Sequence, residues 1–184
     1  MARAVAEPEL LTAPERLAWV GGPHAVILLH QVGMDMHSWA PQASALAGVG
    51  YTVVAIQNSG PNGLKLAIAD LRQRCGVATV TVVGASIGGN VAGDALRSAP
   101  EAIDRIIFLS SDVDVSLFGE MPKLFVASDG EGMSLDPAAL ARESAGTDNT
   151  AVSFPGAAHA QEIFATNNGG ALLALILAWL DART

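Results

Sequence analysis

The stretch from residue 79 to residue 92 constrains the fold more than any other part of the chain. Its first residues, Thr79 to Val83, are apolar or β-branched and predict a buried strand, whereas the glycines and small residues that follow predict a tight turn and the start of a helix. Ser86 falls at the turn, with a glycine two positions before it and another two positions after it. Because glycine has no side chain to clash, this spacing allows the chain to bend sharply at the serine.

The pentapeptide Gly84-Ala85-Ser86-Ile87-Gly88 has the Gly-x-Ser-x-Gly pattern of a nucleophile elbow. In such a turn the serine Oγ is lifted clear of the sheet at the N-terminus of a helix, where negative charge is favoured. The amide of the next residue, Ile87, then points toward the position of an oxyanion. The pattern predicts Ser86 as a nucleophile. The alternative interpretation is a glycine-rich turn with an ordinary polar serine.

Apolar segments and helical segments alternate along the rest of the chain. Strands are expected at 17–20, 25–30, 51–56, 79–83, 105–110, 123–127 and 150–154. Helices are expected after Ser38, at 64–74, after the turn at Ser86, from Asp136 and at 170–181. This alternation predicts an α/β fold with a mostly parallel sheet and helices on both faces, in which ligands bind at the carboxyl ends of the strands. We expect a single domain over residues 1–184, with residues 1–15 as an extended lead-in.

The composition narrows the classes of partner. The formal net charge of −8 disfavours nucleic acid and anionic membrane surfaces, and the single cysteine, Cys75, excludes an internal disulfide and a multi-cysteine metal site. The most apolar stretch, Ala171 to Leu180, is too short to span a bilayer, and the N-terminus carries acids where a signal peptide would be apolar. We therefore expect a cytoplasmic protein that binds a small molecule, with no nucleic acid or membrane partner. The oligomeric state stays open.

A serine nucleophile needs a base, and the chain offers four histidines. His24 lies before a strand, at the wrong end of the sheet, and His30 ends a central strand, where a structural role is common. His37 precedes the serine in a loop that could line a pocket. His159 follows the last expected strand on a short loop of small residues, and we expect it to be the base.

These segments together resemble the α/β-hydrolases of the serine esterase and lipase kind. The resemblance runs from about residue 17 to the end and rests on Leu28-Leu29-His30-Gln31-Val32-Gly33, the elbow, the segment from Leu124 to Met133, and Gly156-Ala157-Ala158-His159. It implies Ser86 as the nucleophile, His159 as the base and then the acid, and the amides of Val32 and Ile87 as the oxyanion hole. This chemistry requires no metal and no organic cofactor.

The sequence identifies the acid that orients the histidine less clearly than it identifies the serine and the histidine. The family pattern places Glu131 at the acid position, with Asp129 two residues earlier as the alternative. A glutamate suits the role because the role is electrostatic and orientational, although its extra methylene changes the reach. Asp112 and Asp114, after the preceding strand, are further alternatives.

Two departures from the family pattern concern the loops around the serine. Gln31 stands where a glycine usually follows the histidine, so it either hydrogen-bonds across its loop or faces solvent. Gln31, Met34 and Met133 are candidate substrate-binding residues, because their loops are expected to converge near Ser86, while core packing explains the methionines equally well.

The short connection between residues 110 and 123 leaves no room for a cap domain.

The sequence thus predicts a minimal, lidless serine hydrolase. The expected reaction is cleavage of a small-molecule carboxylic ester with a small to medium acyl chain, through an acyl-enzyme. Thioesterase or acyltransferase activity would use the same residues. A catalytically idle binding protein that kept the fold is the alternative from another class, because fold alone does not establish activity.

Overall fold

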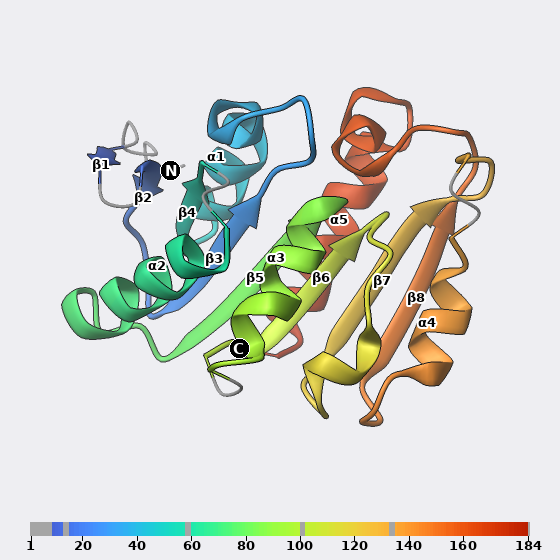
Figure 1. The fold of residues 1–184 in the computed structure, drawn as a ribbon. Helices are drawn as coiled ribbons and strands as arrows, with labels where there is room; N and C mark the ends of the chain where they lie inside the picture. The colour runs from blue at the N-terminus through green and yellow to red at the C-terminus, as the bar shows by residue number, and fades with distance from the viewer. Residues whose placement is uncertain (1–8, 13–14, 58–59, 100–101, 133–134, 184) are drawn as a thin grey trace.

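One eight-stranded sheet runs through the computed structural model, which describes residues 9–12, 15–57, 60–99, 102–132 and 135–183 (Figure 1). The strand order is β1-β2-β4-β3-β5-β6-β7-β8. The strands from β3 to β8 pair parallel with one another, whereas β2 is antiparallel to both of its neighbours, β1 and β4. Their bounds are Glu9–Thr12 (β1), Glu15–Trp19 (β2), His24–Leu29 (β3), Thr52–Ile56 (β4), Thr79–Ala85 (β5), Arg105–Leu109 (β6), Lys123–Ser128 (β7) and Asn149–Phe154 (β8).

Helices cover both faces of the sheet, as the fully buried central strands require. One face packs against α1 (Ala40–Gly48) and α5 (Gly169–Asp181) and forms a core that contains Trp39 and Trp179. The other face packs against α2 (Pro61–Arg74), α3 (Ile87–Leu96) and α4 (Pro137–Glu143). In that second core, Phe108 stacks on Phe125 and meets Phe118 edge to face. The α/β architecture and the parallel core of the sheet are confirmed.

The first strands show how the N-terminal segment joins the sheet. Residues 1–8 and 13–14 of the expected lead-in lie outside the described residues, and residues 9–12 form β1, which pairs with β2. The following strand, β2, pairs with β4 rather than with β3, its neighbour along the chain. The lead-in expected for residues 1–15 therefore includes a paired edge strand.

The strand order reverses at β3, which lies between β4 and β5. In open α/β sheets, the loops on the two sides of such a reversal separate and leave a crevice at the carboxyl ends of the strands. Here the loop after β3 and the turn after β5 border that position. The topology thus places residues 30–35 and Ser86 at the carboxyl ends of the strands, where a ligand site is expected.

The connection from β6 to β7 is short. It contains only a 3-10 turn, η2 (Val115–Phe118), and then the chain re-enters the sheet at Lys123. No cap domain is inserted at this point, as the sequence predicted. None of the helices in the described parts of the chain is both long enough and apolar enough to cross a membrane.

Lys123, at the start of β7, is fully buried although its side chain carries a charge. Its Nζ donates to the backbone carbonyls of Gly119 at 2.7 Å, Met121 at 2.8 Å and Ala145 at 2.8 Å. Burial lowers the pKa of the Lys123 ammonium, and the charge of Glu120 partly opposes that shift. The side chain therefore joins the connection before β7 to the connection after α4.

Replacing Lys123 by methionine should lower the free energy of unfolding by about 2 kcal/mol, because three carbonyls lose their donor while the apolar stem is kept. Urea unfolding measures this change. Lys65, the other lysine of the chain, is the matched control, since its Nζ contacts only Ser98 Oγ at the surface among the bonds described. Lys65→Met should cost under about 0.5 kcal/mol. Equal losses would show that the carbonyl contacts of Lys123 do not stabilise the fold.

Candidate active site

Ser86 occupies a strained turn between β5 and α3. Its φ of 52° and ψ of −116° lie outside the ordinary regions for a residue with a side chain, and such a conformation costs about 1–3 kcal/mol. The turn is held by a hydrogen bond from the Ser86 amide to the carbonyl of Leu109 in β6, at 2.8 Å. Ile87 begins α3, so its amide belongs to the first turn of the helix, whose N–H groups have no partner within the helix.

The glycines around Ser86 are explained by close packing. A Cβ on Gly84 would lie 2.6 Å from the amide nitrogen of Gly89, and a Cβ on Gly88 would lie 2.8 Å from the Cβ of Leu29 at the end of β3. At these distances only a hydrogen atom fits at either position, and a Cβ atom is excluded. The elbow therefore packs directly on the end of β3, which brings the loop after β3 beside Ser86.

Glu131 and His159 meet between the loops that follow β7 and β8. The Nδ1 atom of His159 lies 3.4 Å from Oε2 of Glu131, and the glutamate side chain is 2% exposed whereas the histidine side chain is 26% exposed. This distance is longer than a good hydrogen bond. A buried carboxylate behind a partly exposed imidazole is the arrangement that orients a histidine base.

Hydrogen bonds fix the two loops relative to one another. The Gly130 amide donates to the Gly156 carbonyl at 2.8 Å, and the Ser128 hydroxyl donates to the Ala158 carbonyl at 2.7 Å. The Glu131 amide in turn donates to the Ser128 carbonyl at 3.3 Å. This turn directs the Glu131 side chain back toward the loop that carries the histidine.

Ser110, which follows β6, connects the elbow to this pair. Its Oγ donates to Oε2 of Glu131 at 2.6 Å and accepts from the amide of Ala160 at 3.1 Å. Its neighbour Leu109 accepts the hydrogen bond from the Ser86 amide. In the described parts of the chain, the non-glycine residues with positive φ are Ser86, Ser110 and Ala160. Backbone strain of this kind clusters at functional sites, and all three residues lie at this edge of the sheet.

A pair of glutamines joins the loop after β3 to the histidine loop. The Gln31 amide donates to Oε1 of Gln161 at 2.9 Å, and the Gln161 amide donates to Oε1 of Gln31 at 2.8 Å. The Gln161 Nε2 also donates to the hydroxyl of Ser38 at 2.9 Å. Both glutamines are 6% exposed. We refer to Gln31 and Gln161 with these reciprocal bonds as the glutamine clasp.

The fold can now be compared with those of known proteins. No family model matches this sequence, and no curated protein sequence matches it. Solved structures do match over nearly the whole chain. The dienelactone hydrolase from Anabaena variabilis superposes with a TM-score of 0.76 at 17% identity, over 96% of this chain and 99% of that chain. This chain has the α/β-hydrolase fold.

Two further solved structures support this assignment. The monoacylglycerol lipase from Paleococcus ferrophilus has a TM-score of 0.73 at 16% identity, over 92% of this chain and 98% of that chain. The esterase from Exiguobacterium antarcticum has a TM-score of 0.67 at 10% identity, over 96% of this chain and 99% of that chain. At these identities the likeness shows the fold alone. This chain is a small form of the α/β-hydrolase fold without a cap.

The α/β-hydrolase fold accounts for where most of the sequence-predicted residues lie. Ser86, Glu131 and His159 are at the carboxyl edge of the sheet, after β5, β7 and β8. The alternative acid Asp129 is exposed, and its amide donates to the carbonyl of Phe154. Of the four histidines, His24 lies at the opposite edge, where its Nδ1 is 2.9 Å from the Thr79 hydroxyl. That Ser86, His159 and a carboxylate act together stays a prediction.

The residues expected to form the oxyanion hole and to bind substrate differ in how exposed they are. The side chain of Val32 is 78% exposed and that of Ile87 is 39% exposed, so both lie on the open surface beside the elbow. Met34 is partly buried, and Met133 lies outside the described residues. For Gln31, the hydrogen-bonded alternative is the one observed. Among the described residues, no group of three histidine, cysteine, aspartate or glutamate side chains is arranged to hold a metal ion.

Two residues of the site, Ser110 and Gln161, escaped the sequence analysis. Ser110 ends an apolar strand and Gln161 comes two positions after the histidine, which are the only sequence signals for either. Their partners lie 21 and 130 positions away in the chain, and no local pattern records those contacts.

Proposed function

We propose that the protein is a serine hydrolase that cleaves carboxylic esters of small to medium acyl chain through an acyl-enzyme. The observation that carries the proposal is the buried Glu131 carboxylate 3.4 Å behind the partly exposed His159 imidazole, at the same sheet edge as a serine held at positive φ. A serine on such a turn, a histidine and a buried acid are the parts that acyl transfer needs. The structural neighbours include an esterase and a lipase, which agrees with this class.

In the proposed reaction, the Ser86 hydroxyl attacks the ester carbonyl while His159 takes its proton. Glu131 holds the imidazole in the tautomer that can accept this proton and stabilises the imidazolium that forms. The amides of Val32 and Ile87 would donate to the oxyanion of the tetrahedral intermediate. His159 then gives the proton to the leaving alcohol. Water, activated by the same histidine, attacks the acyl-enzyme, and the acid is released with Ser86 restored.

The open surface around the elbow favours soluble esters. In the described parts of the chain no cap domain covers the site, and Val32 and Ile87 are exposed. A substrate would therefore be held mainly by the reacting group and the adjacent loops. This arrangement suits small and medium acyl groups better than long chains, which need an enclosed apolar pocket.

A fluorophosphonate probe tests the proposal directly, because an activated serine displaces fluoride from the phosphorus and becomes covalently labelled. Labelling should occur in the native protein and fall to background in Ser86→Ala and His159→Ala. Ser153→Ala, which changes an exposed serine of β8, is the matched control and should be labelled like the native protein. An unlabelled native protein with an intact fold would instead support a catalytically idle binding protein.

A further inference from the structure

Ser110 contacts the loops that follow β7 and β8 at the same time. It comes directly after β6 and is 2% exposed. Its Oγ lies 2.6 Å from Oε2 of Glu131 and 3.1 Å from the amide nitrogen of Ala160, the residue after His159. The residue before it in β6 accepts the hydrogen bond from the Ser86 amide. One small side chain therefore joins the acid to the histidine loop, next to the strand that holds the elbow.

The Ala160 amide fixes the direction of these hydrogen bonds. A backbone N–H can only donate, so the Ser110 Oγ accepts at that contact. The one hydroxyl hydrogen of Ser110 is then left for Oε2 of Glu131, and a distance of 2.6 Å is typical of a hydroxyl that donates to a carboxylate. Oε2 of Glu131 is therefore an acceptor.

The same carboxylate oxygen faces His159. Its distance to Nδ1 of the imidazole is 3.4 Å. Because Oε2 is an acceptor, this contact is attractive only when Nδ1 carries the hydrogen, and Nε2 then keeps a lone pair. A lone pair on Nε2 is what His159 needs in order to take a proton from Ser86. The hydroxyl of Ser110 thus favours the tautomer that a base requires.

The Glu131 carboxylate has few other partners that could hold it. Its side chain is 2% exposed, and Oε1 has no hydrogen-bond partner among the described residues. A buried charge needs hydrogen bonds, which makes the Ser110 hydroxyl important for the carboxylate. Ser110 presents this hydroxyl from a fixed backbone, because its φ is 48° and its amide donates to the Val126 carbonyl of β7 at 2.7 Å.

We propose that Ser110 is a positioning residue, which holds Glu131 and the loop after β8 so that His159 keeps its hydrogen on Nδ1. In this role Ser110 does not touch the substrate. It acts through the Glu131 carboxylate and the Ala160 amide. The expected effect on kcat rests on the proposed hydrolase function, whereas the expected effect on the imidazole does not.

¹⁵N NMR of the histidine rings tests the proposal without a substrate, because the two tautomers of an imidazole give different ¹⁵N shifts. The protein is labelled with ¹⁵N-histidine, and the His159 signals are assigned by their loss in His159→Ala. Spectra are read above the pH range in which the imidazole is protonated. We expect the Nδ1–H tautomer of His159 in the native protein and a mixture of the two tautomers in Ser110→Ala.

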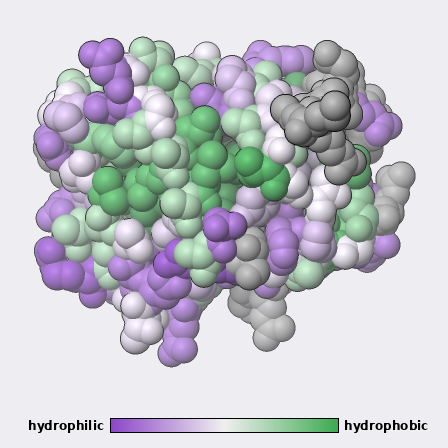
Figure 2. Space-filling model, turned by 180° about the vertical axis from the view of Figure 1, so that it is seen from behind, coloured by the Kyte–Doolittle hydropathy of each residue, from purple (hydrophilic) through white to green (hydrophobic). Residues whose placement is uncertain are grey.

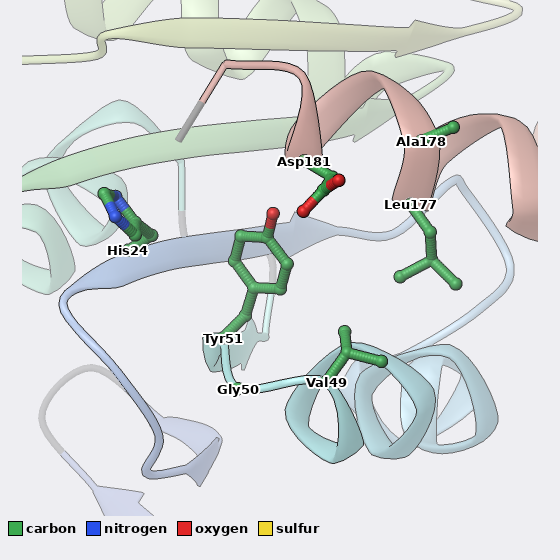
Figure 3. A pocket seen from close by; sticks show the side chains of 7 residues that line it. All are labelled: His24, Val49, Gly50, Tyr51, Leu177, Ala178 and Asp181. Carbon is green, nitrogen blue, oxygen red and sulfur yellow. The ribbon is translucent and has the colours of Figure 1, made fainter.

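His24 is an internal reference for this measurement. It lines a hollow of about 460 Å³ at the opposite end of the strands, and its Nδ1 lies 2.9 Å from the Thr79 hydroxyl (Figure 3). In Figure 3 the Asp181 carboxylate points toward the Tyr51 hydroxyl rather than toward His24. Because the surroundings of His24 do not include the acid loop, its ring signals should be the same in Ser110→Ala as in the native protein.

The apolar surface of the molecule requires a control for protein concentration. Figure 2 shows hydrophobic side chains gathered across the middle of the side on which α5 lies. An apolar face favours self-association at the concentrations that NMR uses. Spectra are therefore recorded at two protein concentrations, and the tautomer of His159 should be the same in both.

Kinetics on p-nitrophenyl acetate give a second measurement. Ser110→Ala should lower kcat about ten- to thirtyfold and change KM by less than about threefold, because a donor to the buried carboxylate is lost while the ester still binds. In a Glu131→Gln protein, adding Ser110→Ala should lower kcat by less than about threefold, since no carboxylate remains to be positioned.

Ser111→Ala is the matched control variant. Ser111 is also 2% exposed, but its hydroxyl donates to the Gly84 carbonyl at 3.0 Å and not to Glu131. This variant should keep the native tautomer of His159 and a kcat within about twofold of the native value. Urea unfolding establishes that each variant is folded. If Ser110→Ala is not, Ser110→Cys is measured in its place and should show the same change to a smaller extent, because a thiol is a weaker donor.

Three results would overturn the proposal. They are an Nε2–H tautomer of His159 in the native protein, an unchanged tautomer in the folded Ser110 variant, and equal losses of kcat from Ser110→Ala in the native and Glu131→Gln proteins. Failure of the proposed function would look different. A native protein that shows the expected tautomers but is not labelled by a fluorophosphonate would refute the hydrolase activity and support the positioning role of Ser110.

Discussion

Replacing Glu131 by glutamine should lower kcat for a model ester such as p-nitrophenyl acetate by about 10³- to 10⁴-fold, or about 4–5.5 kcal/mol in the activation free energy. Glutamine has nearly the same shape as glutamate, so the buried site should be kept. Its amide, however, can donate to Nδ1 of His159 and thereby favour the tautomer whose Nε2 carries the proton. Such a histidine cannot take the proton from Ser86, and the neutral amide does not stabilise an imidazolium.

Asp129→Asn is the matched control, because it makes the same chemical change two residues earlier on an exposed side chain. Its kcat should stay within about twofold of the native value. Steady-state kinetics on both variants, with urea unfolding to confirm that both are folded, completes the comparison. If Asp129→Asn were the more damaged variant, Asp129 rather than Glu131 would be the acid. Two unaffected variants would remove the triad from the proposed function.

Glu131 can be told apart from Asp129 only in the structure, because a turn after β7 places the two side chains differently. In the sequence, Asp129 and Glu131 are both acids on the loop after a buried strand, and residue type does not separate them. In the fold, the Glu131 amide closes a turn on the Ser128 carbonyl, and the side chain is covered by the histidine loop. Asp129 is left at the surface. Loop geometry of this kind depends on contacts with β8, which no local pattern contains.

The central strands could be predicted because their residues are apolar on both faces. The strands that end at Leu29, Ile56 and Ala85 are buried except at the first residues of β3 and β5, and burial on both faces is what an unbroken apolar run indicates. The N-cap of the first helix was harder to predict. A helix was expected after Ser38, whereas Asp35 caps a 3-10 turn, η1 (Met36–Trp39), and α1 begins at Ala40. Serine and aspartate are comparable caps, and the tertiary contacts of Met36 and Trp39 with the core select between them.

The glutamine clasp is the part of the site that depends most on long-range contacts, and we expect it to position the proposed oxyanion donor. Gln161 accepts from the amide of Gln31, which immediately precedes Val32, and Gln161 itself lies two positions after His159. The clasp therefore sets the distance between the loop that would hold the oxyanion and the loop that carries the histidine. The second bond of the clasp runs from the Gln161 amide to Gln31 Oε1. It joins the same two loops, with the donor now on the loop that carries the histidine.

Gln161→Ala should lower kcat by about 10²-fold, because it leaves the buried Gln31 amide without an acceptor and allows the Val32 loop to shift. KM should change much less, since donors to an oxyanion act in the transition state rather than on the bound ester. Gln161→Glu keeps an oxygen for the Gln31 amide and should recover most of the lost kcat. Gln73→Ala, on the exposed side of α2, should behave like the native protein. Equal damage by Gln161→Ala and Gln161→Glu, or a loss confined to KM, would mean that the clasp only stabilises the fold.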